Sequence, residues 1–194
     1  MRVIAGSEKG RRLKSVGHVR LRPTADRVRE GLFSILASRF ELCDAVVLDL
    51  FAGTGALGIE ALSRGAGRAV FVEQGHGALR ILRENVELCG FALRAEIWPL
   101  PVRRALRGLE EHAYRFDGVL LDPPYRRGLV ASTLEMLSES ALLRAGAWVV
   151  AEGHVDEAVS ESYGPLRLTR NRRYGKTSIV LYSLTDIDST AAGS

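Results

Sequence analysis

VVLDLFAGTGALGIEAL, residues 46–62, joins an apolar run to a helix-like segment through three glycines. Gly53, Gly55 and Gly58 have the spacing G-x-G-x-x-G, which between a strand and a helix is typical of a site for a nucleotide cofactor. A glycine here lets the backbone turn tightly and approach a ligand where a Cβ atom would collide. The stretch therefore predicts a cofactor at this loop, but the spacing alone does not decide which one.

Strand-like and helix-like segments alternate from this loop onward. The strand-like runs cover residues 45–51, 68–73, 94–100, 117–124 and 147–153, and the helix-like segments cover 56–64, 77–90, 102–113 and 128–143. This spacing is typical of β-α-β crossovers, which give a mainly parallel sheet with helices on both faces. The last two strand-like pieces, 166–175 and 176–184, predict an antiparallel hairpin at the sheet edge. The predicted fold class is therefore α/β, with a Rossmann-like sheet.

The chain before residue 45 has a different pattern. The pieces "RVIAG", "SEKG" and "RRLK", residues 2–14, predict a short β-hairpin that extends from the main domain as an exposed appendage. Thr24 is expected to cap the next helix. The apolar face of that helix is formed by Val28, Leu32, Ile35 and Leu36. We expect a basic N-terminal hairpin extension over 1–22, a main domain over 23–184 and a disordered tail over 185–194.

Composition excludes several classes of protein. The 194 residues are 46% hydrophobic and 26% charged, which is close to globular averages. No apolar run is long enough to span a membrane, and no signal peptide is evident, so we expect a cytoplasmic protein without a membrane partner. Cys43 and Cys89 form no disulfide framework, and no histidines have metal-ligand spacing, so no metal is expected. We expect a monomer.

Positive charge is concentrated at the N-terminus. Residues 1–30 carry nine Lys/Arg and three Asp/Glu, whereas the formal net charge of the whole chain is +4. A cluster of this kind is typical of a nucleic-acid contact, because each cation can replace a phosphate counterion. The residues expected to make the contact are Arg2, Lys9, Arg11, Arg12, Lys14, Arg22 and Arg27.

Two acidic residues narrow the choice of cofactor. Asp49 lies near the end of an apolar strand, where a carboxylate is costly unless it accepts hydrogen bonds or faces a cation. It would repel a pyrophosphate, so it favours S-adenosylmethionine (SAM), which carries an ammonium and a sulfonium, over NAD or FAD. Glu73 ends the second strand, where an acid can accept both ribose hydroxyls of either cofactor type. The cofactor-binding residues expected around the loop are Asp49, Phe51, Ala52, Gly53, Gly55, Gly58 and Glu73.

The stretch "GVLLDPPYRRG", residues 118–128, indicates the chemistry. Two prolines cannot donate to a sheet ladder, so the fourth strand must stop at Asp122. The Asp122 carboxylate and the Pro123 carbonyl can accept the two N–H groups of a planar amine, which turns the nitrogen lone pair toward an electrophilic methyl group. Tyr125 can stack on the base, and Pro124 stiffens the turn. These residues predict methyl transfer to an exocyclic base amine.

The chain resembles the SAM-dependent amino-methyltransferases, and among them the RsmD-type enzymes that methylate guanine N2 in small-subunit (16S) ribosomal RNA. The resemblance rests on "MRVIAGSEKGRRLK", "LRPTADRVREGLFSIL", "LDLFAGTGALGIEALSRGA", "VFVE", Asn85, "DPPY" and "RRYGKT". It implies a class I methyltransferase fold, SAM as cofactor, and catalysis by the stretch from Asp122 to Tyr125. It also implies RNA contact by Arg173, with 16S rRNA in the small subunit or an assembly intermediate as partner.

The sequence departs from this family at one point. After the third strand the family usually carries an Asp that receives the adenine amino group, whereas this chain has Leu100 or Pro101 there. The adenine is therefore expected to rest on Leu100 and the neighbouring backbone. Two alternatives stay open: adenine-N6 methylation of nucleic acid, and a non-catalytic RNA-binding assembly protein with a vestigial pocket. An NAD oxidoreductase comes last, because no residue for hydride transfer is evident.

Overall fold

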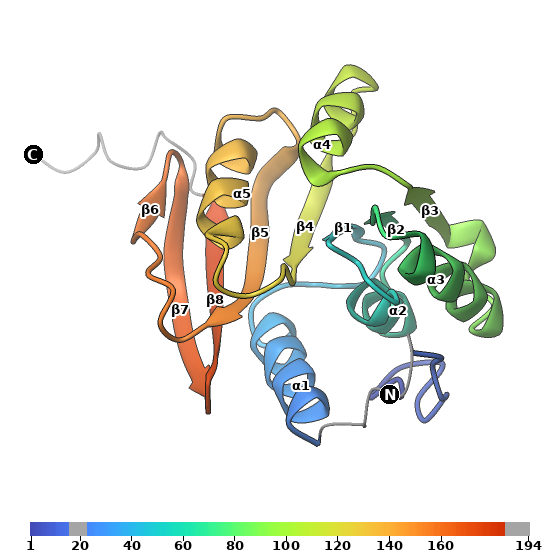
Figure 1. Ribbon diagram of the computed structural model, residues 1–194. Coiled ribbons are helices and arrows are strands. Elements are labelled where there is room, and N and C mark those ends of the chain that lie inside the picture. The colour runs from blue at the N-terminus through green and yellow to red at the C-terminus, as the bar shows by residue number, and fades with distance from the viewer. Residues whose placement is uncertain (16–22, 185–194) are drawn as a thin grey trace, which may run out of the picture.

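A mixed β-sheet is the centre of the computed structural model, which describes residues 1–15 and 23–184 (Figure 1). Within these residues the strand order is β3-β2-β1-β4-β5-β8-β7-β6. The strands are β1 Val46–Leu50, β2 Arg68–Val72, β3 Ala95–Trp98, β4 Phe116–Leu121, β5 Leu143–His154, β6 Ser162–Tyr163, β7 Leu166–Tyr174 and β8 Thr177–Leu184. The first five strands pair in parallel, and β5, β8, β7 and β6 pair in antiparallel fashion. The predicted α/β fold class is confirmed.

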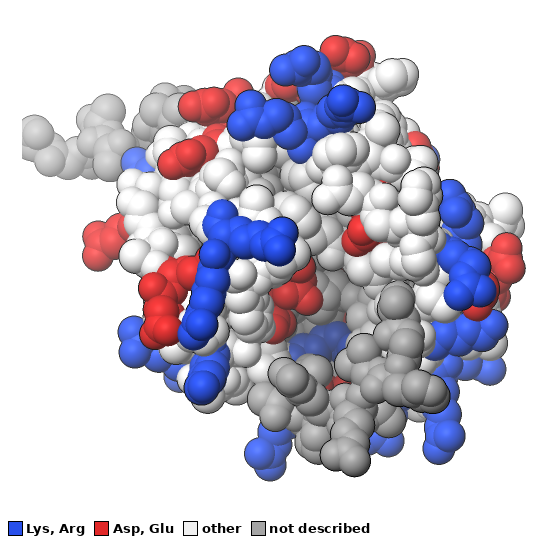
Figure 2. Space-filling model, in the orientation of Figure 1, with Lys and Arg blue, Asp and Glu red and all other residues white. Residues whose placement is uncertain are grey.

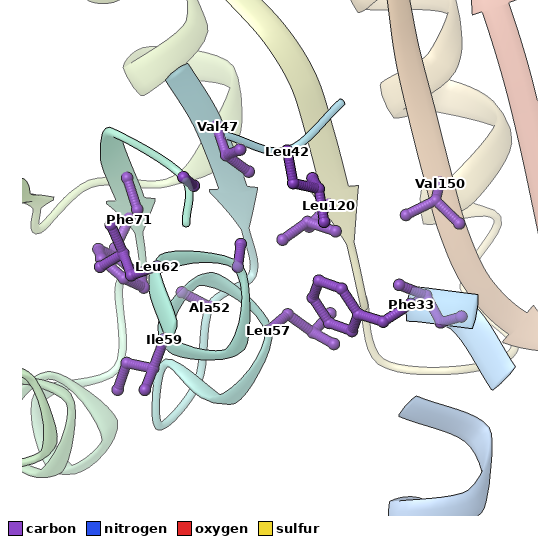
Figure 3. Close-up of a cluster of buried hydrophobic side chains, with 14 of the residues drawn as sticks. Phe33, Leu42, Val47, Ala52, Leu57, Ile59, Leu62, Phe71, Leu120 and Val150 are labelled. Carbon is purple, nitrogen blue, oxygen red and sulfur yellow. The ribbon is translucent and has the colours of Figure 1, made fainter. Parts of the chain in front are cut away.

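Helices cover both faces of the sheet because the strand side chains alternate between two apolar clusters. The helices are α1 Pro23–Ala37, α2 Ala56–Ser63, α3 His76–Leu88, α4 Val102–Glu111 and α5 Leu129–Ser138, with a 3-10 turn at Ala92–Arg94. Val47 packs with α1, α2 and α3, whereas its neighbour Leu48 packs with α4 and α5. Figure 3 shows Phe33 of α1 and Leu57 of α2 in the first cluster. Each fully buried side chain of this size contributes about 1.5–3 kcal/mol.

The C-terminal strands follow the prediction with two differences. The β7–β8 hairpin is present, and β8 pairs with β5. β5 begins at Leu143 rather than near residue 147, because Leu143 pairs with Phe116 before a bulge. β6 was not predicted, since two residues are too few to show a pattern. Beyond Leu168, whose amide donates to the Glu161 carbonyl, the outer edge of β7 has no strand partner among the described residues.

The N-terminal segment, residues 1–15, corrects the prediction of an exposed hairpin. Its strands reduce to one antiparallel bridge between Arg2 and Arg12. Val3 is 1% exposed and Leu13 is 6% exposed, and both belong to the cluster under α1, α2 and α3. The cause lies in α2, where the Glu60 carboxylate accepts two backbone amides of the segment at 2.7 and 3.0 Å. The segment is therefore docked on the domain.

Helix α1 begins two residues earlier than the expected cap at Thr24 implies. It starts at Pro23, so Thr24 lies in the first turn and does not precede the helix as a cap. The predicted apolar face is confirmed, with Val28, Leu32 and Leu36 buried. Arg22 and the tail over 185–194 lie outside the described residues.

Candidate active site

A cavity of about 430 Å³ opens outside the carboxyl ends of the parallel strands. It lies where the strand order reverses between β1 and β4, the position at which sheets of this type bind ligands. The structure brings together these predicted residues in its lining: Phe51, Gly53, Glu73, Leu100, Asp122, Pro123, Pro124 and Tyr125. The lining also includes Val72, Gln74 and Val102, which the sequence did not single out.

Glu73 is held rigidly at the end of β2. One carboxylate oxygen accepts the Gly53 amide at 2.8 Å, and the other accepts the amides of Gln74 and Gly75 at 2.9 and 2.7 Å. Each carboxylate oxygen has two lone pairs, so acceptor capacity remains for a hydroxyl group in the cavity. This arrangement fits the ribose of a nucleoside cofactor.

The three glycines of the loop have different roles. A Cβ atom on Gly53 would meet only the Phe51 carbonyl at 3.9 Å, so the backbone there is open to a ligand. A Cβ atom on Gly55 would lie 2.3 Å from Leu82, and one on Gly58 would lie 2.3 Å from Phe71. Gly55 and Gly58 do not line the cavity, and their lack of a side chain lets α2 pack closely on its neighbours. The predicted close approach to a ligand is thus possible at Gly53, while Gly55 serves packing.

Asp49 lies beneath the glycine loop and does not line the cavity. It is 1% exposed, and it accepts the Gly58 amide at 2.8 Å. Burial raises the pKa of Asp49, the hydrogen bond from Gly58 lowers it and the charge of Glu73 raises it, and together they bring the pKa to about 7. Ala52 is also buried and outside the lining. In this structure, Asp49 braces the start of α2 from below.

The turn after β4 presents Asp122 at the cavity. The Asp122 amide donates to the Leu50 carbonyl at 3.5 Å, which aligns the ends of β4 and β1. Asp122 is exposed as a whole residue, although protein atoms crowd its carboxyl group. This crowding, followed by the charges of Glu152 and Asp49, raises the pKa of Asp122 above its usual range.

Tyr125 contacts residues of β5 and β8 that the sequence analysis missed. Its hydroxyl donates to the Glu152 carboxylate and lies 3.2 Å from the Thr177 hydroxyl. Tyr125 is 38% exposed, and its ring packs edge-on against His154, with 5.9 Å between ring centroids. Burial and the hydrogen bond to Glu152 raise the pKa of Tyr125. Glu152 ends an apolar run just as Glu73 does, and this signal could have identified it.

Asn85 of α3 connects the glycine loop to the N-terminal segment. Its amide nitrogen donates to the carbonyls of Thr54 and Lys14, at 2.9 and 3.1 Å. Its amide oxygen accepts the Lys14 backbone N–H at 2.7 Å. Asn85 is 0% exposed, and the three hydrogen bonds are partly buried.

The charges of the cavity favour a cationic ligand. Its lining contains the carboxylates of Glu73 and Asp122 and, among the described residues, no lysine or arginine. Figure 2 shows acidic atoms near the centre of one face and basic side chains around them. A pyrophosphate would meet repulsion here, whereas the ammonium and sulfonium of SAM would be attracted.

The predicted basic residues lie on three elements. Arg2, Lys9, Arg11, Arg12 and Lys14 are exposed on the N-terminal segment, Arg27 on α1 and Arg173 on β7. Arg11 pairs with Glu8, and Lys14 pairs with Glu84. Arg170, Arg172 and Arg173 line a second cavity, of about 500 Å³, beside α1. Within residues 1–15 and 23–184 these three arginines have no ion-pair partner.

The described residues contain no cluster of metal-ligating side chains and no helix long and apolar enough to cross a membrane.

Residues 1–183 match the family described as Conserved hypothetical protein 95. The chain is 35% identical over 182 residues to Ribosomal RNA small subunit methyltransferase D of Escherichia coli, covering 94% of this chain and 89% of that protein. The yhhF protein of Escherichia coli has the same fold, with a TM-score of 0.79, 34% identity, and coverage of 95% of this chain and 98% of that chain. At 17% identity and a TM-score of 0.63, the fold also matches an RNA methyltransferase of Salinibacter ruber in complex with S-adenosylhomocysteine, over 85% of this chain and 95% of that chain. The chain therefore belongs to the Conserved hypothetical protein 95 family, and it is a methyltransferase with the class I fold of SAM-dependent enzymes.

Proposed function

We propose that this enzyme transfers a methyl group from SAM to the N2 amine of a guanine in 16S ribosomal RNA. One observation carries the proposal: the turn from Asp122 to Tyr125 borders the acidic cavity and also contacts Glu152 beyond it. The turn thus has a cofactor-sized cavity beside it and an exposed aromatic ring that a base can stack on. The name of the Escherichia coli relative, a small-subunit rRNA methyltransferase, supports the choice of RNA.

The cofactor residues proposed are those around the glycine loop. Glu73 accepts a ribose hydroxyl with the oxygen that also accepts the Gly53 amide, and the open backbone at Gly53 allows close approach. Leu100 supplies an apolar wall for the adenine. Asp49, Ala52, Gly55 and Gly58 support the loop from beneath. When bound, SAM supplies an electrophilic methyl group on a sulfonium and leaves as the neutral thioether.

Asp122 and Pro123 then orient the amine. The Asp122 carboxylate and the Pro123 carbonyl accept its two N–H groups, Tyr125 stacks on the base, and Pro124 limits movement of the turn. The nitrogen lone pair forms the new N–C bond, and the nitrogen sheds a proton that the Asp122 carboxylate can accept. A base amine within a helix cannot reach this turn, so the guanine must be splayed out of the RNA. Catalysis here is mainly the orientation of two bound partners.

Binding of the RNA backbone is assigned to the exposed cations of the N-terminal segment, α1 and β7. The proposed partner is 16S rRNA in the small subunit or in an assembly intermediate, in the cytoplasm. The enzyme is proposed to act as a monomer.

The test is nucleoside mass spectrometry of small subunits that lack the modification, after incubation with enzyme and SAM. The expected product is N2-methylguanosine. Asp122→Asn should lower turnover by roughly 10²-fold or more, since it weakens a contact that strengthens as the nitrogen gains positive charge. SAM and RNA affinities should change little.

Two outcomes would contradict the proposal. Detection of N6-methyladenosine would select the adenine alternative, and SAM binding without any methylated product would favour the assembly protein. Normal turnover by the Asp122→Asn variant would remove the turn from the catalytic site.

A further inference from the structure

Asp122 and Glu152 occupy neighbouring positions at the carboxyl edge of the sheet. In the parallel β4–β5 pair Leu121 is opposite Ala151, so the next residue on each strand is Asp122 and Glu152. Adjacent strands lie about 4.8 Å apart, which keeps the two carboxylates within reach of one planar ligand. The cavity lining includes Asp122 but not Glu152. Glu152 therefore lies one strand beyond Asp122, on the side away from Glu73.

Glu152 is held in a fixed position, as expected of a residue that recognises a ligand. Its backbone is fixed by pairing with Ile179 of β8, and one carboxylate oxygen accepts the Tyr125 hydroxyl. Among the described residues its other oxygen has no hydrogen-bond donor, and the carboxylate has no ion-pair partner. Burial raises the pKa of Glu152, and the charge of Glu152 raises the pKa of Asp122. Two carboxylates placed in this way favour a ligand that offers two adjacent N–H donors.

The Watson–Crick edge of guanine is such a ligand. Its N1–H and 2-amino group are neighbouring donors, whereas adenine presents its 6-amino group beside the acceptor N1. A carboxylate facing N1 of adenine would meet a lone pair, and its own acceptor would stay unpaired. A site built to accept a substrate N–H can reject the analogue lacking it by large factors.

We propose that Glu152 is a specificity-determining residue that accepts the N1–H of the target guanine while Asp122 accepts its 2-amino group. Tyr125 contacts the face of the base, while the β5–β8 pairing holds the Glu152 backbone at the edge. This inference rests on the proposed function, because it explains how that site distinguishes guanine from adenine. A narrower role is that Glu152 only orients the Tyr125 ring, and the experiment separates the two.

The experiment compares RNAs that carry guanine or 2-aminopurine at the mapped target position. 2-Aminopurine keeps the 2-amino group, but its N1 has no hydrogen. Single-turnover methyl transfer by the wild-type enzyme should be roughly 10²-fold faster on guanine. Glu152→Gln can donate its amide N–H to N1 of 2-aminopurine, so the guanine preference should fall at least tenfold. The ratio of the two rates does not depend on the fraction of active enzyme.

Tyr125→Phe is the matched control, because it removes the hydroxyl that contacts Glu152 and leaves the carboxylate in place. It should slow transfer to both RNAs by similar factors and keep most of the guanine preference. If Glu152→Gln also slows both reactions equally, Glu152 only positions Tyr125 and the inference is overturned. If the wild-type enzyme makes no N2-methylguanosine from the guanine RNA, the proposed function itself fails.

Discussion

A single buried carboxyl group should leave a measurable trace in stability. Asp49 has a pKa of about 7 in the folded protein, against an ordinary value of 3.8. The folded state therefore binds this proton more tightly than the unfolded state does. The resulting stabilisation is complete below about pH 4 and is lost as the pH rises through 7. Asp49→Asn should remove this pH dependence, because an amide oxygen can still accept the Gly58 N–H and carries no charge.

Denaturant unfolding of both proteins at pH 5 and pH 8, without cofactor, measures the difference. From pH 5 to pH 8 the wild type should lose more unfolding free energy than Asp49→Asn, by an amount on the order of 1–3 kcal/mol. Equal losses of unfolding free energy in the wild type and in Asp49→Asn would show that water reaches the Asp49 carboxylate in the folded protein.

Residue type and position in the sequence identified important acidic residues. They were a poorer guide to the groups that these acids contact. The cost of a carboxylate in an apolar strand singled out Asp49, and the position at the end of the second strand singled out Glu73. That Asp49 braces Gly58 from below depends on how the backbone turns, which the sequence pattern does not show. Glu152 gave the same signal as Glu73. Its contact with Tyr125 follows from the β4–β5 register, which is a tertiary property.

At the scale of elements, Asn85 couples α3, the glycine loop and the N-terminal segment. Asn85→Ala removes three partly buried hydrogen bonds and leaves the Lys14 amide and the Thr54 carbonyl without these partners. The expected cost is roughly 2–4 kcal/mol of stability. SAM affinity should also fall, because the loop loses its anchor. Thermal unfolding, SAM titration and hydrogen exchange at residues 1–15 together measure both effects.

Glu84→Ala is the control for this change. Glu84 neighbours Asn85 on α3 and also contacts Lys14, but through an exposed ion pair between side chains. Such pairs contribute about 0–1 kcal/mol, so this variant should stay near wild type. Equal losses in the two variants would mean that the segment is held by its charge and not by the Asn85 amide.

Helices and strands were predicted correctly where burial produces a regular pattern of apolar residues. The prediction failed at the N-terminal segment, where no such pattern is present. The five parallel strands are short apolar runs between helices, a pattern that needs no tertiary information. The N-terminal segment has strand-like composition, but Glu60 and Ser63 of α2 take up several of its backbone groups. An isolated hairpin is marginal in water, so docking on α2 prevails.

For the whole molecule, the placement of cations predicts the salt dependence of RNA binding. Lys9→Glu with Arg12→Glu changes two exposed residues of the N-terminal segment that have no ion-pair partner within the described chain. RNA affinity should fall, and the plot of log affinity against log salt should become shallower, since fewer counterions are released. SAM affinity should not change. Filter binding at several salt concentrations gives the slope.

A charge-matched control is Arg39→Glu with Arg115→Glu. Both residues are exposed. Arg39 precedes β1 and Arg115 precedes β4, so they lie toward the amino ends of these strands, away from the cavity at the carboxyl ends. This pair alters net charge by the same amount but lies away from the proposed RNA contact. It should therefore reduce RNA affinity less and leave the salt slope close to that of the wild type. Identical slopes for the two double variants would show that only total charge matters, and not the N-terminal segment.

The open outer edge of β7 has a consequence for the colloidal behaviour of the protein. Unpaired edge strands can join to the same edge of another copy and start aggregation. Here Arg170 and Arg172 lie on that strand without counter-ions among the described residues, so two such edges repel each other. At 1 M salt the Debye length shrinks to about 3 Å and this repulsion is screened. The protein should thus lose solubility at the ionic strength at which RNA dissociates from it. At lower ionic strength, bound RNA would protect the β7 edge from pairing with another copy.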